Sequence, residues 1–310
     1  MNLKITTTIF IFLTCFSVFS QEADGRSMEE IMNAPNPEKY KELNLNNRSL
    51  TKLPIEIGKF VNIEKLWLNY NNLQSLPIEL VKCTKLRELY INNNVLPRFP
   101  IEVTKIMSLE KLEIQKNKLE YISPAIGKLI KLKKINFSTN KIEALPVEVS
   151  SLINLTDFNV FDNKIKEIPV EIMQLSKLKN LNFEKNLISV LPIEIGNLTE
   201  LAILNLKNNK LALIPNEIGT LKNLTNLNLE QNLLKKFPAT ICSLSNLWFL
   251  DLDNNLFKTL PPEITKLVNL RELYLGVNPW EKMPQETYSF LENLEYGQSE
   301  IVRKLVKSKI

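Results

Sequence analysis

The sequence predicts a solenoid, a stack of short repeating coils rather than a single globule. Three observations predict this fold. A 23-residue unit repeats eleven times without insertion or deletion. Seven of its positions are apolar in every copy, with Thr287 as the single exception. An asparagine and a proline recur at fixed places. A period of this length is typical of stacked repeats, which bury their apolar faces against one another.

Each copy divides into a strand half and a helical half. In a representative copy the apolar positions are Leu201, Leu204, Leu206, Leu211, Ile214, Ile218 and Leu221. Residues on either side of the fourth and sixth positions point away from the core, because side chains alternate across a strand. The copies start at Tyr40, Ile63, Leu86, Leu109, Leu132, Leu155, Leu178, Leu201, Leu224, Leu247 and Leu270. Together they span residues 40–292.

The ninth position of the repeat is asparagine in ten copies. Arg48 replaces it in the first copy. After each strand the backbone turns into the core, and a carboxamide supplies both a donor and an acceptor for the backbone groups buried there. We predict a structural asparagine ladder in which each member needs a preceding repeat. The ladder asparagines are Asn71, Asn94, Asn117, Asn140, Asn163, Asn186, Asn209, Asn232, Asn255 and Asn278.

A proline and a glutamate recur in the helical half. Proline follows the fifth apolar position in ten copies, and glutamate lies two residues later in nine. Proline suits the first position of a helical turn, and a carboxylate there offsets the positive end of the helix dipole. We therefore interpret these glutamates as helix chemistry rather than as an acidic binding strip.

The template LxxLxLxxNxLxxLPxEIxxLxx resembles the leucine-rich repeat family in its 23-residue class. The resemblance covers Tyr40 to Glu292 and implies a curved, horseshoe-shaped α/β solenoid. In this fold one strand from each repeat joins a parallel sheet on the inner face, and short helical turns, 3-10 or α, lie on the outer face. The chain is also similar to the small secreted leucine-rich repeat proteins of spirochaetes, which consist of a signal peptide and a bare solenoid. Residues 36–47 look like the start of such solenoids. This resemblance implies a secreted bacterial protein that acts in surface or extracellular interactions.

The first twenty residues differ from the rest of the chain. Residues 1–20 carry Lys4 as their only charge and an apolar run from Ile5 to Phe19. This pattern predicts a secretory signal peptide that is cleaved after Ser20. No other apolar run is long enough to cross a membrane, so we predict no integral span after cleavage.

The repeats are flanked by short segments that we interpret as caps. Residues 21–39 are predicted to form an N-terminal cap with a short helix, because Ser27 and Glu30 have the spacing of a capping box. Residues 293–310 are predicted to form a C-terminal capping helix, because their apolar residues recur at helical spacing.

The composition argues against an enzyme, a cofactor-binding protein and a nucleic-acid-binding protein. The chain has no histidine, which excludes histidine-dependent triads and imidazole bases. Its seven glycines are too far apart for a phosphate-binding loop. The net charge of +5 is mild, and the lysines are scattered among glutamates, which does not predict nucleic-acid binding. Cys83 and Cys242 lie too far apart along the predicted stack for an intramolecular disulfide. We predict no catalytic residue, no cofactor and no metal.

Aromatic side chains mark the predicted inner face near both ends of the solenoid. They occupy variable inner positions and are Trp67, Tyr70, Tyr90, Phe161, Trp248, Phe249 and Tyr274. Exposed Trp and Tyr are enriched in binding hot spots, so we predict that these residues contact a protein ligand on the concave face. The alternative is that the rings cover strand edges or pack on their neighbours.

Two aspartates accompany the C-terminal aromatics. Asp251 and Asp253 alternate along one predicted strand, so both are expected to face the inner surface and to belong to the ligand-binding face. Their oxygens would suit calcium, but a third carboxylate is missing from the predicted site. We therefore favour solvated surface over a weak calcium site.

A second row of asparagines occupies the central inward strand position of five successive repeats. The inner-face asparagines are Asn136, Asn159, Asn182, Asn205 and Asn228, and Asp251 continues the row. We favour a structural role in which their carboxamides bond to one another along the stack. The alternative is an adaptable polar surface for a protein or glycan ligand.

Three functional hypotheses follow. The first is a non-enzymatic module, secreted or on the cell surface, that binds a host receptor or another extracellular protein through its concave face. The second is glycan or cell-wall binding through the same face. The third is a periplasmic structural scaffold. A monomer is favoured in each case.

Overall fold

The computed structural model describes residues 25–281, 284–292 and 294. These residues form eleven β-strands, eleven 3-10 turns and two α-helices. The predicted signal peptide at residues 1–20 lies outside the described residues. Of the predicted capping helix at 293–310, only residue 294 is described, and it is not part of a helix. Both therefore stay predictions.

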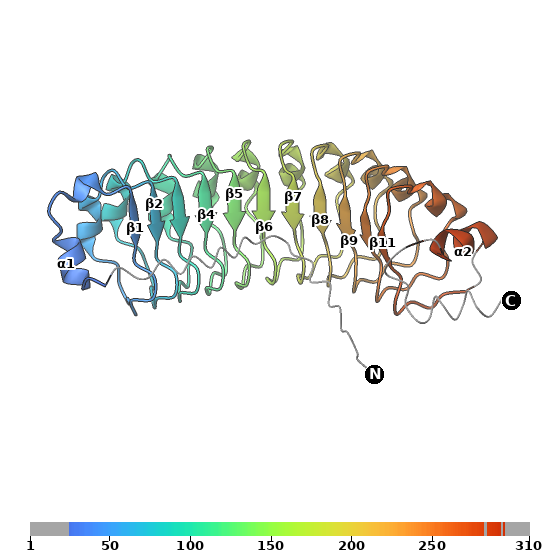
Figure 1. Cartoon of the computed structure of the whole chain (residues 1–310), viewed down its shortest axis with the longest axis horizontal. Helices are drawn as coiled ribbons and strands as arrows, with labels where there is room; N and C mark the ends of the chain where they lie inside the picture. Colours follow the sequence, from blue (N-terminus) through green and yellow to red (C-terminus); the bar gives the residue numbers. More distant parts are fainter. Residues whose placement is uncertain (1–24, 282–283, 293, 295–310) are drawn as a thin grey trace.

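One parallel sheet runs the length of the molecule (Figure 1). Its strands are β1 (Glu42–Asn44), β2 (Lys65–Trp67), β3 (Glu88–Tyr90), β4 (Lys111–Glu113), β5 (Lys134–Asn136), β6 (Asp157–Asn159), β7 (Asn180–Asn182), β8 (Ile203–Asn205), β9 (Asn226–Asn228), β10 (Phe249–Asp251) and β11 (Glu272–Tyr274). The strands follow one another in sequence order, and paired residues such as Asn205 and Asn228 are one repeat apart. The predicted solenoid is confirmed.

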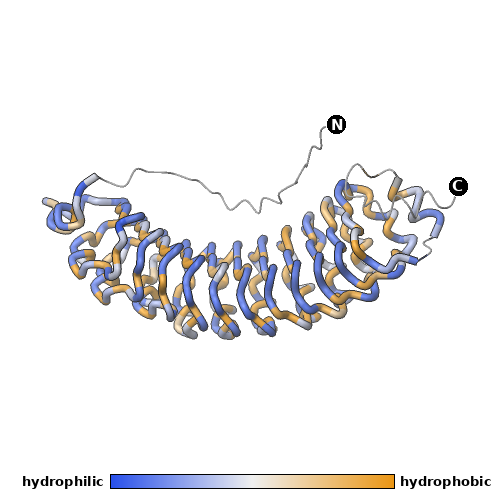
Figure 2. Tube along the Cα trace, turned by 90° about the horizontal axis from the view of Figure 1, so that it is seen from below, coloured by the Kyte–Doolittle hydropathy of each residue, from blue (hydrophilic) through white to orange (hydrophobic). Residues whose placement is uncertain are grey.

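The sheet curves along its length, as Figure 2 shows when it is compared with Figure 1. The strands line the hollow inner side of the arc, and the 3-10 turns lie on the outer side. The middle residue of each strand is buried in the core, whereas its neighbours face the hollow. The variable side chains predicted to lie together do therefore share one concave surface.

Ten of the 3-10 turns form the outer half of the repeats. They are η2 (Ile55–Lys59), η3 (Ile78–Lys82), η4 (Ile101–Lys105), η5 (Pro124–Lys128), η6 (Val147–Ser151), η7 (Val170–Gln174), η8 (Ile193–Asn197), η9 (Asn216–Thr220), η10 (Ala239–Ser243) and η11 (Pro262–Lys266). In most of them the recurrent proline is the residue before the turn rather than its first residue, as at Pro192 before η8. Proline lacks a backbone N–H, so this position costs no hydrogen bond.

Short helices lie at the two ends of the described solenoid. The predicted N-terminal helix is α1 (Met28–Met32), followed by η1 (Pro37–Lys39). The capping box is complete, because the Glu30 N–H donates to Ser27 Oγ at 3.1 Å and the Ser27 N–H donates to the Glu30 carboxylate at 2.6 Å. At the other end, α2 (Gln285–Glu292) begins within the last repeat and buries Tyr288 and Leu291.

A single core of aliphatic and aromatic side chains fills the space between the sheet and the turns. Within it, Cys83 and Cys242 are buried free thiols, and burial raises the pKa of each to about 11. Among the residues that the structure describes, none of the helices has the length and hydrophobicity of a membrane span.

Candidate functional site

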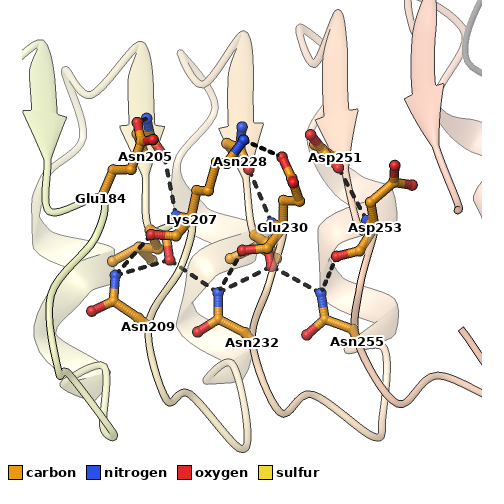
Figure 3. Close-up of polar contacts among 12 residues, drawn as sticks. Glu184, Asn205, Lys207, Asn209, Asn228, Glu230, Asn232, Asp251, Asp253 and Asn255 are labelled. Atoms are coloured by element: carbon orange, nitrogen blue, oxygen red, sulfur yellow. Dashed lines mark hydrogen bonds and ion pairs between the residues drawn. The ribbon is translucent and has the colours of Figure 1, made fainter. Parts of the chain in front are cut away.

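The ladder asparagines sit where each strand turns into the core, and they bond across repeats. Asn186 Nδ2 donates to the carbonyls of Val160 in the preceding repeat and Phe183 in its own, both at 3.0 Å. Its Oδ1 accepts the N–H of Ile165, also in the preceding repeat, at 3.0 Å. All ten members bond to the preceding repeat in this way. Figure 3 shows three of them. Their carboxamides are fully used by the backbone, so this row is structural.

The contacts around Arg48 explain why the first repeat has no ladder asparagine. Asn71 Oδ1 accepts the N–H groups of Arg48 and Leu50, so the second repeat satisfies the first. A ladder asparagine in place of Arg48 would have no preceding repeat to receive its amide. Arg48 instead donates from its guanidinium to the Arg26 carbonyl at 2.7 Å, which ties the first repeat to the N-terminal cap.

The inner-face asparagines bond differently from the prediction. Each Oδ1 accepts the backbone N–H two residues later in its own repeat, as Asn182 does from Glu184 at 2.9 Å and Asn205 from Lys207 at 3.1 Å. Asn136, Asn159 and Asn228 do the same. Carboxamide-to-carboxamide bonds along this row are not found among the described residues, so that prediction was wrong. The competing interaction is a local side-chain bond to the turning backbone, which asparagine forms readily.

This local bond fixes the direction of each inner-face carboxamide. With Oδ1 held by the chain's own N–H, the Nδ2 group is the part of the carboxamide that is left for other partners. Two of these groups meet neighbouring side chains: Asn136 donates to Gln115 at 3.2 Å and Asn205 to Glu184 at 2.8 Å. Those of Asn159, Asn182 and Asn228 have no acceptor among the described residues. The row is therefore a set of oriented hydrogen-bond donors.

The N-terminal aromatics divide into a packed pair and an exposed ring. Trp67 and Tyr90 stack on adjacent strands with centroids 5.7 Å apart and planes 8° from parallel. Lys111 Nζ lies 4.8 Å from the centroid of Tyr90, and the Tyr90 hydroxyl donates to Glu88 at 2.5 Å. Tyr70 is separate: it has a left-handed backbone, with φ of 57°, and its residue is 55% exposed.

The C-terminal aromatics do not form one exposed cluster. Trp248 is 43% exposed, Tyr274 is half-buried, and Phe249 is only 1% exposed. Phe249, the first residue of β10, packs diagonally against Tyr274, the last residue of β11, at a centroid distance of 5.5 Å. Phe249 therefore presents almost no surface to a ligand. Phe161, farther along the sheet, is half-buried beneath Lys185, whose Nζ lies 6.0 Å from the ring centroid.

Asp251 is not solvated surface, contrary to the interpretation from sequence, whereas Asp253 is half-buried. Asp251 is buried, and its carboxylate accepts the Asp253 N–H at 3.0 Å. The Asp253 carboxylate accepts the N–H of Gly276, where any larger residue would place a Cβ against the carboxylate. Burial raises the pKa of Asp251 to about 8, and it also raises the pKa of Asp253.

Two further carboxylates extend this pair along the sheet, as Figure 3 shows. We call Glu184, Glu230, Asp251 and Asp253 the carboxylate cluster. Lys207 lies between its members and pairs with Glu230 at 2.5 Å. Burial raises the pKa of Glu184, whose carboxylate accepts the Asn205 amide. In the described part of the chain no group of three or more acidic or cysteine side chains is arranged to hold a metal ion.

The two halves of the inner face carry different charge. Over the variable inner positions, the first five repeats have seven basic and five acidic residues, whereas the last six repeats have four basic and seven acidic residues. In the first half neighbouring strands neutralise one another, as Lys65 does with Glu42 at 3.3 Å and Glu88 at 3.9 Å. In the carboxylate cluster, Lys207 pairs with Glu230, and the charges of Lys207 and Lys185 both act on Glu184. The C-terminal half is therefore acidic.

Comparison with known families decides the assignment. The family described as leucine-rich repeat region matches residues 115–210 and 194–296, and a second family of paired leucine-rich repeats matches residues 61–100. The first of these spans more than half of the chain. The chain belongs to the leucine-rich repeat family.

Solved leucine-rich repeat structures share its fold. A leucine-rich repeat protein of Leptospira interrogans is 32% identical, with a TM-score of 0.74 over 84% of this chain and 72% of its own. The receptor-kinase ectodomain GASSHO1/SCHENGEN3 of Arabidopsis thaliana, solved in complex with CASPARIAN STRIP INTEGRITY FACTOR 2, is 25% identical, with a TM-score of 0.68 over 83% of this chain and 35% of its own. The functional domain of InlJ from Listeria monocytogenes is 23% identical, with a TM-score of 0.74 over 86% and 55%. No curated protein sequence matches the chain.

Two further rows of side chains link the leucine-rich repeats and were not identified from sequence. Near the N-terminus, Asn46 Oδ1 accepts the Asn69 N–H at 2.7 Å, and Asn69 Oδ1 accepts the Asn92 N–H at 2.8 Å. At the last position of the repeat, asparagines donate to a carbonyl of the preceding repeat, as Asn154 does to Ile130 at 2.9 Å. The signal was present in the recurrence of asparagine at this position, at Asn62, Asn154, Asn223, Asn246 and Asn269.

Proposed function

We propose that this leucine-rich repeat protein is an exported, non-enzymatic module that binds a protein ligand through its concave face. Leucine-rich repeats are typically binding modules rather than enzymes. The observation that carries the proposal is the inner face itself, where oriented amide donors and a carboxylate cluster lie on one hollow surface. Tyr70 and Trp248, 55% and 43% exposed, border that surface. Large, partly exposed aromatic rings are frequent anchors of protein interfaces.

The comparisons support a protein ligand and a bacterial setting. One similar receptor ectodomain was solved in complex with CASPARIAN STRIP INTEGRITY FACTOR 2. The 32% identity to a Leptospira interrogans protein supports the resemblance to spirochaete solenoids, and so a host receptor or extracellular protein as the partner. We propose a secreted or cell-surface location on the same grounds, with the periplasm as the alternative compartment.

Glycan binding receives less support from the aromatic geometry. Sugar rings stack on open aromatic faces, but Trp67 and Tyr90 cover one face of each other, and Lys111 lies over the remaining face of Tyr90. A role as a periplasmic scaffold has no specific observation in its favour. Protein binding is therefore the function that we propose.

The test is cross-linking capture of host cell-surface proteins by the purified chain, followed by a titration with each captured protein. Trp248→Ala and Tyr70→Ala are the variants, and Ile153→Ala is the matched control, because Ile153 is an exposed apolar residue on the outer half of its repeat. We expect Trp248→Ala or Tyr70→Ala to weaken binding about tenfold and the control to leave it within about twofold. If a captured protein binds the chain that carries both Tyr70→Ala and Trp248→Ala as tightly as the parent chain, the concave face is not its binding site.

Location needs a separate measurement. We expect the chain, expressed in its own bacterium, in the culture supernatant or in the fraction accessible to protease added to intact cells. Recovery only from the protected periplasmic fraction would instead support a scaffold role and remove the host partner. N-terminal sequencing of the same material checks cleavage after Ser20.

A further inference from the structure

The outer side of the solenoid carries an exposed apolar row that the proposed function does not use. We propose that this row is the contact between two copies of the chain, which pair back to back and antiparallel about η5. The inference goes beyond the binding function of the concave face, because the two concave faces of such a dimer point away from each other and both stay open. It also departs from the monomer that we favoured from the sequence.

The row, which we call the apolar ridge, consists of the first residue in each of seven successive turns, η2 to η8. Six of these residues are Ile or Val, between 43% and 61% exposed, and the seventh is the exposed Pro124 of η5. The polar Asn216 ends the ridge at η9. A continuous exposed apolar row on a soluble chain usually marks a contact surface. The six residues are Ile55, Ile78, Ile101, Val147, Val170 and Ile193.

The charge beside the ridge changes sign along its length. Counted over the eight residues up to the end of each turn, η2 to η4 have five basic and three acidic residues, whereas η6 to η8 have four acidic residues and no basic one. The exposed lysines that end the first three turns, Lys59, Lys82 and Lys105, form no ion pair within the described chain. Two parallel ridges would oppose like charges. Two antiparallel ridges place each basic segment against an acidic one.

The centre of the ridge has the composition that a two-fold axis requires. At such an axis each residue meets its own copy, so a carboxylate there would face a carboxylate. Glutamate is the second residue of η2, η3, η4, η6, η7 and η8, but Ala125 takes its place in η5. Lys128, the remaining charge of η5, is long enough to turn toward Glu148 of the second copy, one turn away. The turn on the axis is therefore free of acidic groups.

The length and curvature of the ridge fit a contact between two copies. Seven repeats at a spacing of about 4.8 Å make a row roughly 30 Å long, and a patch of about 800 Å² per partner is about that wide. The outer side is convex, as Figure 2 shows, so two copies approach most closely at η4 to η6. Exposed Met107, Ile130 and Ile153, each two residues after one of these turns, add apolar surface there. Toward η2 and η8 the surfaces diverge, and the long lysine side chains can bridge the gap.

A lipid surface fits the ridge less well than a second copy does. A bilayer is flat on this scale and would meet only the middle of a convex ridge. An anionic bilayer would attract the η2 to η4 half and repel the η6 to η8 half, where no basic residue lies beside the ridge. A second copy supplies both signs of charge in the order that the ridge needs.

The test is sedimentation equilibrium of the full chain at low salt, from about 1 to about 100 μM. We expect the average mass to rise from one chain, 35.8 kDa, toward two. Ile101→Ser with Val147→Ser should weaken the dimer at least about tenfold, because both residues lie next to the axis. The matched control, Leu213→Ser with Val268→Ser, removes exposed apolar residues outside the ridge and should change it by less than about twofold. A parent chain that stays monomeric, or equal losses in the two variants, would overturn the proposal.

A charge exchange tests the antiparallel arrangement. When η3 of one copy lies opposite η7 of the other, Lys82 faces Glu171. We expect Lys82→Glu and Glu171→Lys each to weaken the dimer about fivefold, because each substitution sets like charges against one another at two symmetric places. The chain with both substitutions should dimerise within about twofold of the parent, since opposite charges face one another again. Equal weakening by the single and the double substitutions would overturn the proposal. Circular dichroism checks that each variant is folded.

Two further measurements separate the dimer from other uses of the ridge. Flotation with vesicles of phosphatidylcholine and phosphatidylglycerol that recovers the parent chain but not the Ile101/Val147 variant would assign the ridge to a membrane and overturn the proposal. A protein captured by the concave face should bind the Ile101/Val147 variant within about twofold of the parent chain. The dimer and the proposed function can therefore fail separately. A larger loss would show that the ridge belongs to the ligand contact, which also overturns the dimer.

Discussion

Two rows of asparagine run through this sheet, and the difference between them lies in what their carboxamides bond to. A ladder asparagine such as Asn209 uses its oxygen and its amide on backbone groups of two neighbouring repeats. An inner-face asparagine such as Asn182 uses only its oxygen, on its own repeat, and its amide has no acceptor within the described chain. The same residue type is thus structural in one row and available to a ligand in the other.

Position within the repeat decides between these two roles. The ninth position lies where the backbone leaves the sheet and enters the core, so unpaired backbone groups of two repeats surround the carboxamide. The fifth position is the last residue of a strand and faces inward, where the asparagine oxygen accepts the backbone N–H two residues later. One bond orients the side chain, and the rest of its hydrogen-bonding capacity stays open.

The largest expected effect is in the ladder. Asn186→Ala removes the acceptor of the Ile165 N–H and the donor to the Val160 and Phe183 carbonyls, all buried. We expect the free energy of unfolding to fall by about 1–3 kcal/mol, measured by urea unfolding. A change near zero would show that the two rows do not differ as the hydrogen bonds indicate.

The second-largest effect on stability is expected at Asp251, which continues the row of inner-face asparagines. The pKa of Asp251 is raised to about 8 in the folded chain, chiefly by burial, from an ordinary value near 3.8. The folded chain therefore holds a proton that the unfolded chain releases, and stability falls as pH rises through that window. Asp251→Asn keeps the acceptor for the Asp253 N–H and removes the ionisable group.

We expect Asp251→Asn to stabilise the chain by on the order of 2 kcal/mol at about pH 9, with the gain vanishing near pH 4. The charged groups around this carboxylate are Lys207, Glu230 and Asp253, and Tyr274 lies opposite Asp251 on β11. The control in the urea unfolding measurements is Asp162→Asn, which removes an inner aspartate already paired with Lys185 at 2.8 Å. A gain of the same size at both pH values would show that proton release from Asp251 is not its cause.

Sequence reasoning identified the fold and the ladder because both rest on periodicity. A 23-residue spacing places Asn186 and Asn209 in equivalent positions on neighbouring coils, and the need to satisfy buried backbone groups then specifies their partners. The burial of Phe249 and Asp251 could not be predicted in the same way. It depends on how the curvature of the sheet draws side chains of adjacent strands together, and the template treats every inward position alike.

The local bond of the inner-face asparagines was also missed, for a related reason. Pairing between equivalent residues is what a repeat suggests, and Asn182 and Asn205 are indeed adjacent across β7 and β8. The backbone N–H of Glu184 lies closer in the chain and needs an acceptor, so it captures the Asn182 oxygen first. Which side chains meet Gly276, Asp253 or Lys207 likewise depends on coordinates rather than on the repeat.

A smaller effect is expected for the asparagines at the end of the repeat. Asn154 is more exposed than a ladder asparagine and makes one bond to the preceding repeat, from its Nδ2 to the Ile130 carbonyl. Lys177 also donates to its Oδ1 at 2.7 Å. We expect Asn154→Ala to lower the free energy of unfolding by about 0.5–1 kcal/mol, measured by urea unfolding. A loss as large as that of Asn186→Ala would show that exposure does not separate the two rows.

The smallest stability effect is expected for Asn182→Ala, although its side chain is as buried as that of Asn186. The substitution removes one acceptor, for the Glu184 N–H, and a donor that had no partner within the described chain. We expect the free energy of unfolding to fall by no more than about 0.5 kcal/mol, because only one local hydrogen bond is lost and the amide removed with it has no partner to lose. Asn186→Ala, measured in parallel, is the matched comparison at equal burial. If Asn182→Ala destabilises the chain as much as Asn186→Ala, the inner row is as structural as the ladder, and its amides are not held open for a ligand.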